Sequence, residues 1–253
     1  MSSKVTGPIL ITGGTGQLGS RIAALMRSES VPHLVAARSA TGPEGVKFDY
    51  TDRETWNNPF EKAAPSTIPA VFLLALPTTV SVELMNEFVD FAIEKGVKRF
   101  VLLSASIVEM GGPVYGKVHT YLKELGDGGL VEWAVLRPTW FMSRVSLMLT
   151  RLGDWALKVL LDNFAEQPHH VKAIKDEGKI YSATGDGRIP WVSADDIAAC
   201  AVQTLTIPQP PNTDYFILGP ELLTYSDVSA LNTVLVQYVF LYCRTMRSAT
   251  DKE

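Results

Sequence analysis

Cysteine is nearly missing from this chain: its 253 residues include only Cys200 and Cys243. That is too few for a disulfide framework or a cysteine-rich zinc site. Long apolar runs are missing too. The longest candidates, 145–161 and 234–243, fall short of the roughly 20 uninterrupted residues of a membrane helix. The first strand is expected from about Pro8, which leaves no room for a signal peptide. We therefore expect a soluble cytoplasmic protein without membrane contacts.

Runs of lysine and arginine are also lacking. Lysine and arginine number 23 against 27 aspartate and glutamate, for a net charge of −4, so no nucleic-acid groove is expected. We find no internal repeat and no low-complexity tract. Hydrophobic residues make up 46% and charged residues 20%, which is typical of a globular protein. At roughly 150 residues per domain, the length predicts one to two domains.

Apolar strands alternate with amphipathic helices through the first half of the chain. Strands are predicted over 8–12, 33–37, 46–48, 70–76, 99–104 and 133–136, and helices over 18–28 and 81–95. This order is typical of α/β proteins with a doubly wound parallel sheet. Beyond residue 137 the alternation fades, and we expect a smaller substrate-binding part there.

The first strand runs directly into a glycine-rich turn, Thr12-Gly-Gly-Thr-Gly-Gln-Leu-Gly19. Such a turn needs glycine for positive φ, for close approach to a pyrophosphate and for helix–strand packing. The following helix would face the phosphates with its N-terminus. The alternative is a structural turn in a fold that binds no nucleotide. The context favours a Rossmann-like NAD(P)-binding domain over 1–142, with phosphate contacts from Gly13, Thr15, Gly16, Gln17, Leu18 and Gly19.

The end of the second strand predicts the choice of cofactor. It reads Ala36-Ala-Arg-Ser39, without the carboxylate that usually holds the ribose 2′-OH of NAD. Arg38 and Ser39 suit a 2′-phosphate, so we predict NADPH; the alternative is that Arg38 is simply solvated. Asp49 is either an adenine contact or an exposed loop residue. Residues 74–77 (LALP) are expected to lie beside the cofactor.

Candidate catalytic groups follow the fifth strand. Ser104 and Ser106 come at its carboxyl end, where ligands of this fold bind. Tyr115 follows, with His119 four residues on. The usual Tyr-x-x-x-Lys pair is incomplete, because Lys117 lies on the wrong helix face and a neutral imidazole at His119 tunes a phenol less than an ammonium does. His119 is alternatively a surface residue. We therefore expect either reduction of an iminium, which needs no proton donor, or a non-catalytic dinucleotide sensor.

Five stretches carry a resemblance to a known family: ILITGGTGQLGSRIA (9–23), RFVLLSAS (99–106), VLRPTWFM (135–142), KIYSATGDGRIPWVSADDIA (179–198) and YFILGPELLTYSDV (215–228). With them the chain resembles the NmrA-like atypical short-chain dehydrogenases, and among these the fungal ergot-alkaloid reductases (festuclavine synthases and agroclavine dehydrogenases). The resemblance implies an NADPH-dependent reductase of fungal specialised metabolism that reduces a cyclic alkaloid iminium. It places pocket-lining residues at Ser104, Ser106, Tyr115, His119, Pro138, Thr139, Trp140 and Phe141.

Two segments depart from the family pattern. Residues 143–162 form an atypical insertion, and the segment that ends the chain (235–253) also differs. We predict that 163–253 completes the fold on the substrate side. Our hypothesis is that both departures come from the gene model, through a missed splice or a frame change, and leave an incomplete pocket beside an intact NADPH site. Within this part, Thr184–Gly187 is predicted to turn, and Ser193 to begin a helix with Asp195 and Asp196 in its first turn.

Three functions remain open at this point. The first is an NADPH-dependent reductase of an iminium or conjugated carbonyl in alkaloid or polyketide metabolism. The second is a non-catalytic NADP(H)-sensing regulator. The third is an isomerase or epimerase, which consumes no cofactor. In each case the expected partner is a small molecule, and the sequence does not predict the oligomeric state.

Overall fold

The computed structural model describes residues 7–74, 80–142, 176–177, 179–228 and 241–244. These residues form two compact units. The first comprises Met1–Pro138 and Asp195–Ile217, and the second comprises Thr139–Ala194 and Leu218–Glu253. The predicted insertion at 143–162 lies outside the described residues. None of the described helices is long and apolar enough to cross a membrane.

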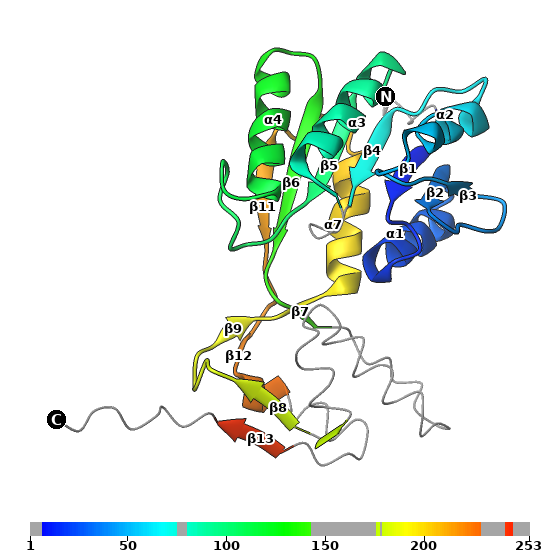
Figure 1. Ribbon diagram of the computed structural model, residues 1–253. Helices are drawn as coiled ribbons and strands as arrows, with labels where there is room; N and C mark the ends of the chain where they lie inside the picture. Colours follow the sequence, from blue (N-terminus) through cyan, green and yellow to red (C-terminus); the bar gives the residue numbers. More distant parts are fainter. Residues whose placement is uncertain (1–6, 75–79, 143–175, 178, 229–240, 245–253) are drawn as a thin grey trace. The chain divides into compact units, whose positions relative to one another are not determined.

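The first unit is a parallel, doubly wound sheet, as predicted (Figure 1). Its seven strands run in the order β11-β6-β5-β4-β1-β2-β3, with every pairing parallel. They span β1 (Ile9–Thr12), β2 (His33–Ala37), β3 (Gly45–Lys47), β4 (Ala70–Leu73), β5 (Arg99–Leu103), β6 (Glu132–Pro138) and β11 (Thr213–Ile217). The order reverses between β1 and β4, which is where such sheets bind ligands.

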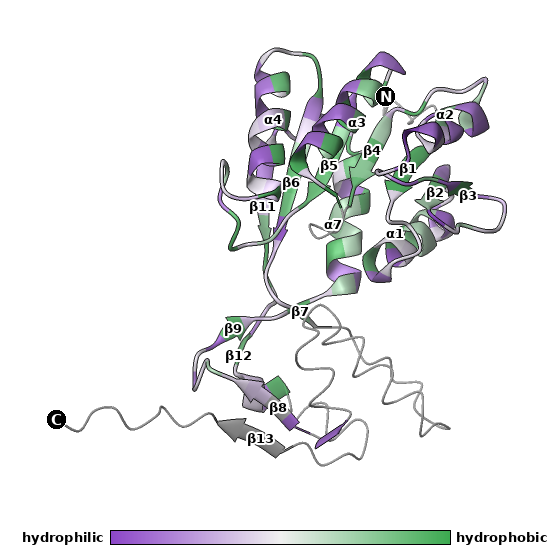
Figure 2. Cartoon of the chain, in the orientation of Figure 1, coloured by the Kyte–Doolittle hydropathy of each residue, from purple (hydrophilic) through white to green (hydrophobic). Residues whose placement is uncertain are grey.

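Helices connect the strands and bury their apolar sides against the sheet. They are α1 (Gln17–Ser28), the short η1 (Arg53–Thr55), α2 (Asn58–Ala63), α3 (Val82–Glu94), α4 (Tyr115–Asp127) and α7 (Ala194–Thr206). In Figure 2 the helices carry both hydrophobic residues (green) and hydrophilic residues (purple). Such amphipathic helices direct one side to the core and the other to solvent.

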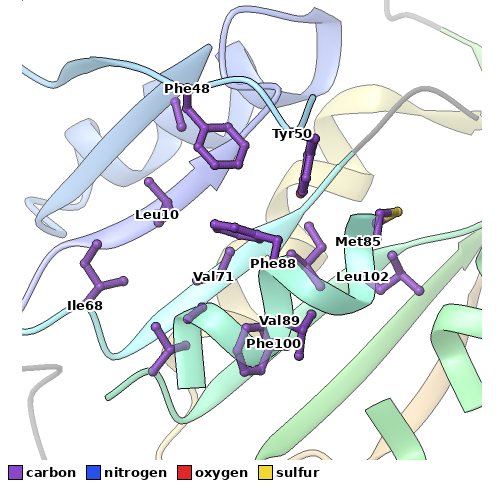
Figure 3. Close-up of a cluster of buried hydrophobic side chains, with 14 of the residues drawn as sticks. Leu10, Phe48, Tyr50, Ile68, Val71, Met85, Phe88, Val89, Phe100 and Leu102 are labelled. Atoms are coloured by element: carbon purple, nitrogen blue, oxygen red, sulfur yellow. The ribbon is translucent and has the colours of Figure 1, made fainter. Parts of the chain in front are cut away.

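Strand alternation divides the core between the two faces of the sheet. Leu10, Val71, Leu73, Phe100 and Leu102 join one cluster with the side chains of α2, α3 and α4 (Figure 3). Their neighbours Ile11, Phe72 and Val101 are equally buried and point to the opposite face. The two remaining long helices, α1 and α7, also have an apolar side of buried residues.

Arg99 fastens α7 to the sheet from the start of β5. Its buried guanidinium donates to the carbonyl oxygens of Thr204 at 3.3 Å and Ile207 at 2.5 Å, and pairs with Glu132. These carbonyls belong to the last turn of α7 and the residue after it, which lack helical partners. The side chain therefore caps a helix that follows it by about a hundred residues.

The second unit is built from short strands. They are β7 (Phe141–Met142), β8 (Lys179–Ser182), β9 (Ile189–Pro190), β10 (Val192–Ser193), β12 (Leu222–Leu223) and β13 (Leu241–Arg244). β10 pairs with β7, β12 with β9 and β13 with β8. The predicted turn is present, because Gly187 N donates to Thr184 O at 2.9 Å and Gly185 has φ +56°. The predicted helix start is present too, with Asp195 and Asp196 in the first turn of α7.

Candidate functional site

The glycine-rich turn joins β1 to α1 as predicted. Gly13 has φ +62°, and a Cβ there would lie 2.3 Å from Leu74 Cδ2. Gly19 is in the first turns of α1, where a Cβ would lie 2.4 Å from Gly13 O and 2.6 Å from Gly14 Cα. The left-handed backbone at the first position and the close helix–turn contact at the second both exclude larger residues.

The N-terminus of α1 is open for an anion. Gly16 is its N-cap residue, no side chain caps it, and the first turn carries no acidic residue. A Cβ at Gly16 would meet only Gly13 O, at 3.2 Å. Thr15 and Gly16 are exposed, whereas Leu18 is buried in the core, so Leu18 has only its backbone to offer a ligand. Free amide groups and the positive end of the helix dipole make such a terminus suited to phosphate.

The end of β2 lies beside this turn. Gly14 N donates to Ala36 O at 3.0 Å, and Thr12 is in register with Ala36. Arg38 and Ser39 come directly after β2 and are exposed. Among the described residues, Arg38 has no ion pair. A guanidinium with no ion pair in the described part of the chain therefore follows the strand whose end is hydrogen-bonded to the turn.

Asp49 organises a turn after β3. Its Oδ1 accepts from Thr51 N at 2.9 Å and Thr51 Oγ1 at 2.8 Å, and its backbone oxygen accepts from Trp56 Nε1 at 3.1 Å. The residue is half-buried. It thus has a local role that the sequence did not reveal; an adenine contact for it stays a prediction. Of 74–77, only Leu74 belongs to the described residues.

Ser104 and Ser106 extend the pairing of β5 with β6 beyond the end of β5. Ser104 N donates to Leu136 O and Ser106 N to Pro138 O, both at 2.8 Å. Ser104 is buried and Ser106 half-buried. Both residues therefore follow the carboxyl end of a central strand, where the sequence analysis expected them.

Tyr115 is the first residue of α4 and is half-buried against the core cluster. Val114, just before it, has φ +47° and ψ −99°. A β-branched residue with positive φ is strained by about 1–3 kcal/mol, and such strain concentrates at functional sites. Lys117 is exposed, in keeping with its predicted place on the wrong face of the helix.

His119 is buried, so the alternative of a surface histidine is wrong. Its ring lies 5.4 Å from that of Trp133, centroid to centroid. Burial lowers the pKa of His119 and the charge of Arg137 adds to this, while Asp214 and Glu109 oppose it. The imidazole is therefore neutral near pH 7 and a poor proton donor.

A buried arginine, which the sequence analysis missed, organises this end of β6. Arg137 Nη1 binds Asp214 at 2.8 Å, and Nη2 binds Glu109 at 3.0 Å and donates to Ser106 O at 3.2 Å. The guanidinium carbon lies 4.2 Å from the ring centroid of Phe216. Only 5% of the arginine side chain is exposed. We call Arg137, Glu109, Asp214 and Phe216 the Arg137 cluster; it holds the loop that carries Ser106.

Of the remaining predicted pocket residues, Pro138 belongs to the first unit and the other three to the second. Pro138 ends β6 and is buried, whereas Thr139 Oγ1 donates to Pro190 O and Phe141 pairs with Val192. Trp140, 38% exposed, has its ring centroid 6.2 Å from that of Trp191 and 6.3 Å from that of Tyr225. Trp191 and Tyr225 were not predicted as partners of Trp140, although both lie in the stretches 179–198 and 215–228 that resemble the family.

A glycine-rich turn that lies where the strand order reverses, and that leads into an uncapped helix N-terminus, defines a Rossmann-type dinucleotide-binding protein. Residues 9–124 match the NAD dependent epimerase/dehydratase family. The chain is 43% identical to festuclavine synthase II of Penicillium roqueforti, over 90% of this chain and 74% of that protein. It is 40% identical to agroclavine dehydrogenase of Claviceps fusiformis, over 90% and 73%. The chain therefore belongs to the oxidoreductase family of festuclavine synthases and agroclavine dehydrogenases.

Solved structures support the same fold. The triphenylmethane reductase of Citrobacter sp., solved with NADP(H), aligns with a TM-score of 0.64 at 17% identity, over 94% of this chain and 79% of that one. The UDP-glucose 4-epimerase of Thermus thermophilus, solved with NAD, aligns with a TM-score of 0.63 at 18% identity, over 93% and 85%. At such low identity the likeness concerns the fold alone.

Proposed function

We propose that this protein is an NADPH-dependent reductase that transfers hydride to an iminium or conjugated carbonyl of an alkaloid-type metabolite. The observation that carries the proposal is the open N-terminus of α1 beside the end of β2, with Arg38 and Ser39 directly after that strand. The names of the relatives, which are festuclavine and agroclavine enzymes, support the substrate class.

The preference for NADPH rests on charge. A 2′-phosphate carries negative charge that an unpaired guanidinium binds through charge-assisted hydrogen bonds. A carboxylate at the same place would instead repel it and favour the ribose hydroxyl of NADH. Arg38 and Ser39 are exposed at the end of β2, and Asp49 is our candidate for the adenine edge.

The chemistry proposed for the site avoids a strong acid. Bound NADPH would supply the hydride. The carbon of an iminium accepts it while the nitrogen keeps the former π pair, so a neutral amine forms without protonation. Ser104, Tyr115 and His119 are then expected to orient the substrate, because His119 is buried with a lowered pKa. We assign substrate contacts to Ser106, Pro138, Thr139, Trp140 and Phe141.

The cofactor assignment is tested by titrating the full chain with NADPH and with NADH, followed by nicotinamide fluorescence. The protein should bind NADPH more tightly. Arg38→Ala should weaken NADPH about tenfold, corresponding to roughly 1.4 kcal/mol, and leave NADH unchanged. Arg27→Ala is the matched control, because this arginine lies in the last turn of α1 and pairs with Glu44. Equal affinity of the unmodified chain for both nucleotides would contradict the proposal.

The incomplete Tyr-x-x-x-Lys pattern favours one alternative, an NADP(H)-sensing regulator. The two functions separate when the NADPH-loaded protein meets a panel of alkaloid iminium compounds. A reductase oxidises NADPH in step with amine formation. Tight NADPH binding without turnover of any of them would favour the sensor.

A further inference from the structure

We propose that Tyr50 is a positioning residue of the cofactor turn. Its buried hydroxyl holds Thr12, and through Thr12 the Gly13 turn, in the geometry that receives the pyrophosphate of the dinucleotide. The inference rests on the proposed function, because it concerns the same site. Nothing in the glycine pattern points to a residue so far along the chain.

Thr12 is the centre of a saturated hydrogen-bond network. Its Oγ1 accepts from Leu74 N at 2.8 Å and from the Tyr50 hydroxyl at 3.0 Å. The same oxygen lies 2.9 Å from Phe72 O and 3.1 Å from Leu74 O. A hydroxyl has one proton to donate and two lone pairs to accept with. Tyr50 and Leu74 fill the lone pairs, and the proton goes to a carbonyl oxygen of β4 or of the residue after it.

This network fixes the turn as well as the strand ends. Thr12 is fully buried and directly precedes Gly13, whose φ is +62°. The Leu74 side chain occupies the space that a Cβ on Gly13 would need, and the Leu74 amide donates to Thr12. The turn and the end of β4 therefore hold each other. Tyr50 joins them from the segment after β3.

The tyrosine ring alone would satisfy the packing at this place. Its centroid lies 4.9 Å from that of Phe48 and 5.4 Å from that of Phe88, and Figure 3 shows the three rings grouped together. Burial raises the pKa of the Tyr50 phenol, with Tyr115 contributing to the same direction and the Thr12 bond opposing it. The hydroxyl therefore stays protonated and donates. A phenylalanine would keep the ring contacts and lose the bond to Thr12.

The test measures NADPH and NADH dissociation constants for four variants of the full chain. Tyr50→Phe should weaken both nucleotides about fivefold, the effect of one buried neutral hydrogen bond. The loss should be the same for both, because they share the pyrophosphate. Thr12→Val should weaken binding at least as much, and the double variant no more than Thr12→Val alone. Thr12→Ser keeps the hydroxyl and should bind nearly as the unmodified chain does.

Two controls separate positioning from general stability. Tyr121→Phe also deletes a tyrosine hydroxyl, but one bound to Asp90 between α4 and α3, and should leave both constants unchanged. Val89→Ala opens a space in the fully buried part of α3; it should lower the melting temperature at least as much as Tyr50→Phe and leave binding within about twofold.

Each outcome decides between the two proposals. If the unmodified chain binds NADPH and Tyr50→Phe binds it equally well, the role of Tyr50 is wrong and the proposed function stands. The same holds if Val89→Ala loses as much affinity as Tyr50→Phe. If the folded, unmodified chain binds neither nucleotide, the proposed function fails and this inference fails with it.

Discussion

The cofactor turn follows β1, and the Arg137 cluster joins β6 and β11 to the loop after β5, so both lie on one sheet. Different forces hold the two regions. At the turn, neutral hydroxyl and amide groups join Thr12, Tyr50 and Leu74. Glycines, which have no side chain, allow the close backbone contacts there. In the Arg137 cluster a buried guanidinium binds two carboxylates. A neutral network costs little to bury and is indifferent to pH, whereas a buried charge is stable only with its partners. The Arg137 cluster, which holds the loop that carries Ser106, is therefore the more easily destabilised of the two regions.

The largest expected effect comes from breaking the charged region. Arg137→Met should lower the free energy of unfolding by about 3 kcal/mol, because it leaves the half-buried Asp214 carboxylate without its partner and removes the bonds to Glu109 and to the Ser106 carbonyl. Urea denaturation at neutral pH measures the change. Arg53→Met is the control, since its pair with Glu87 is exposed and should contribute less than about 1 kcal/mol. Equal losses in the two variants would show that the Arg137 cluster has no special role in stability.

Gly19→Ala should have the next largest effect, at the turn. The new Cβ would meet backbone atoms of Gly13 and Gly14 at 2.4–2.6 Å, so the helix must shift, at a cost of about 2 kcal/mol. We expect NADPH affinity to fall at least about tenfold, since the turn moves with it. Gly128→Ala is the matched control: this glycine has φ −75° and its nearest contacts are 3.5 Å away. That variant should be neutral or slightly stabilising.

A smaller effect should appear on acidification, beside the Arg137 cluster. Burial lowers the pKa of His119 below its ordinary value near 6.5, so the unfolded chain takes up a proton that the folded chain refuses. Stability should therefore fall as the pH drops below about 6.5, by at most about 1.4 kcal/mol per pH unit, until the folded pKa is reached.

Urea denaturation of the unmodified chain and of His119→Gln across this range measures the difference, and the variant should show the flatter profile. Asp214 acts with the same sign in a more acidic range. Its hydrogen bond with Arg137 lowers its pKa, so its contribution is present above the ordinary aspartate range and is lost only at more acidic pH. Identical slopes for the two proteins between pH 7 and pH 5 would contradict the assignment to His119.

Local patterns predicted the elements around the turn well. The strand over 33–37 matches β2, and the helix over 18–28 differs from α1 by one residue, because apolar periodicity and the glycine turn both depend on nearby residues. The edge strand β11 was not predicted as part of the sheet. Its residues TDYFI are half-exposed, so they lack the continuous apolar run of a buried strand.

The contacts that surround the candidate site were mostly beyond sequence reasoning. Arg137 stands out as a charge in an apolar strand, but its partners come from residues 109 and 214. Likewise Tyr50 follows a short strand and reaches a threonine 38 residues earlier. Spacing along the chain identifies groups on one helix or strand; it does not reveal which distant segments a fold brings together.

The first unit is made of two separate stretches of the chain, which affects how it can fold during synthesis on the ribosome. Its sheet and helices need residues 195–217, which are synthesised after most of the second unit. Until Ile207 emerges, Arg99 has no helix end to cap, and β6 has no β11 beside it. The first unit therefore finishes folding late, although most of it comes first in the chain. Until then its uncovered apolar face is open to chaperones or to aggregation.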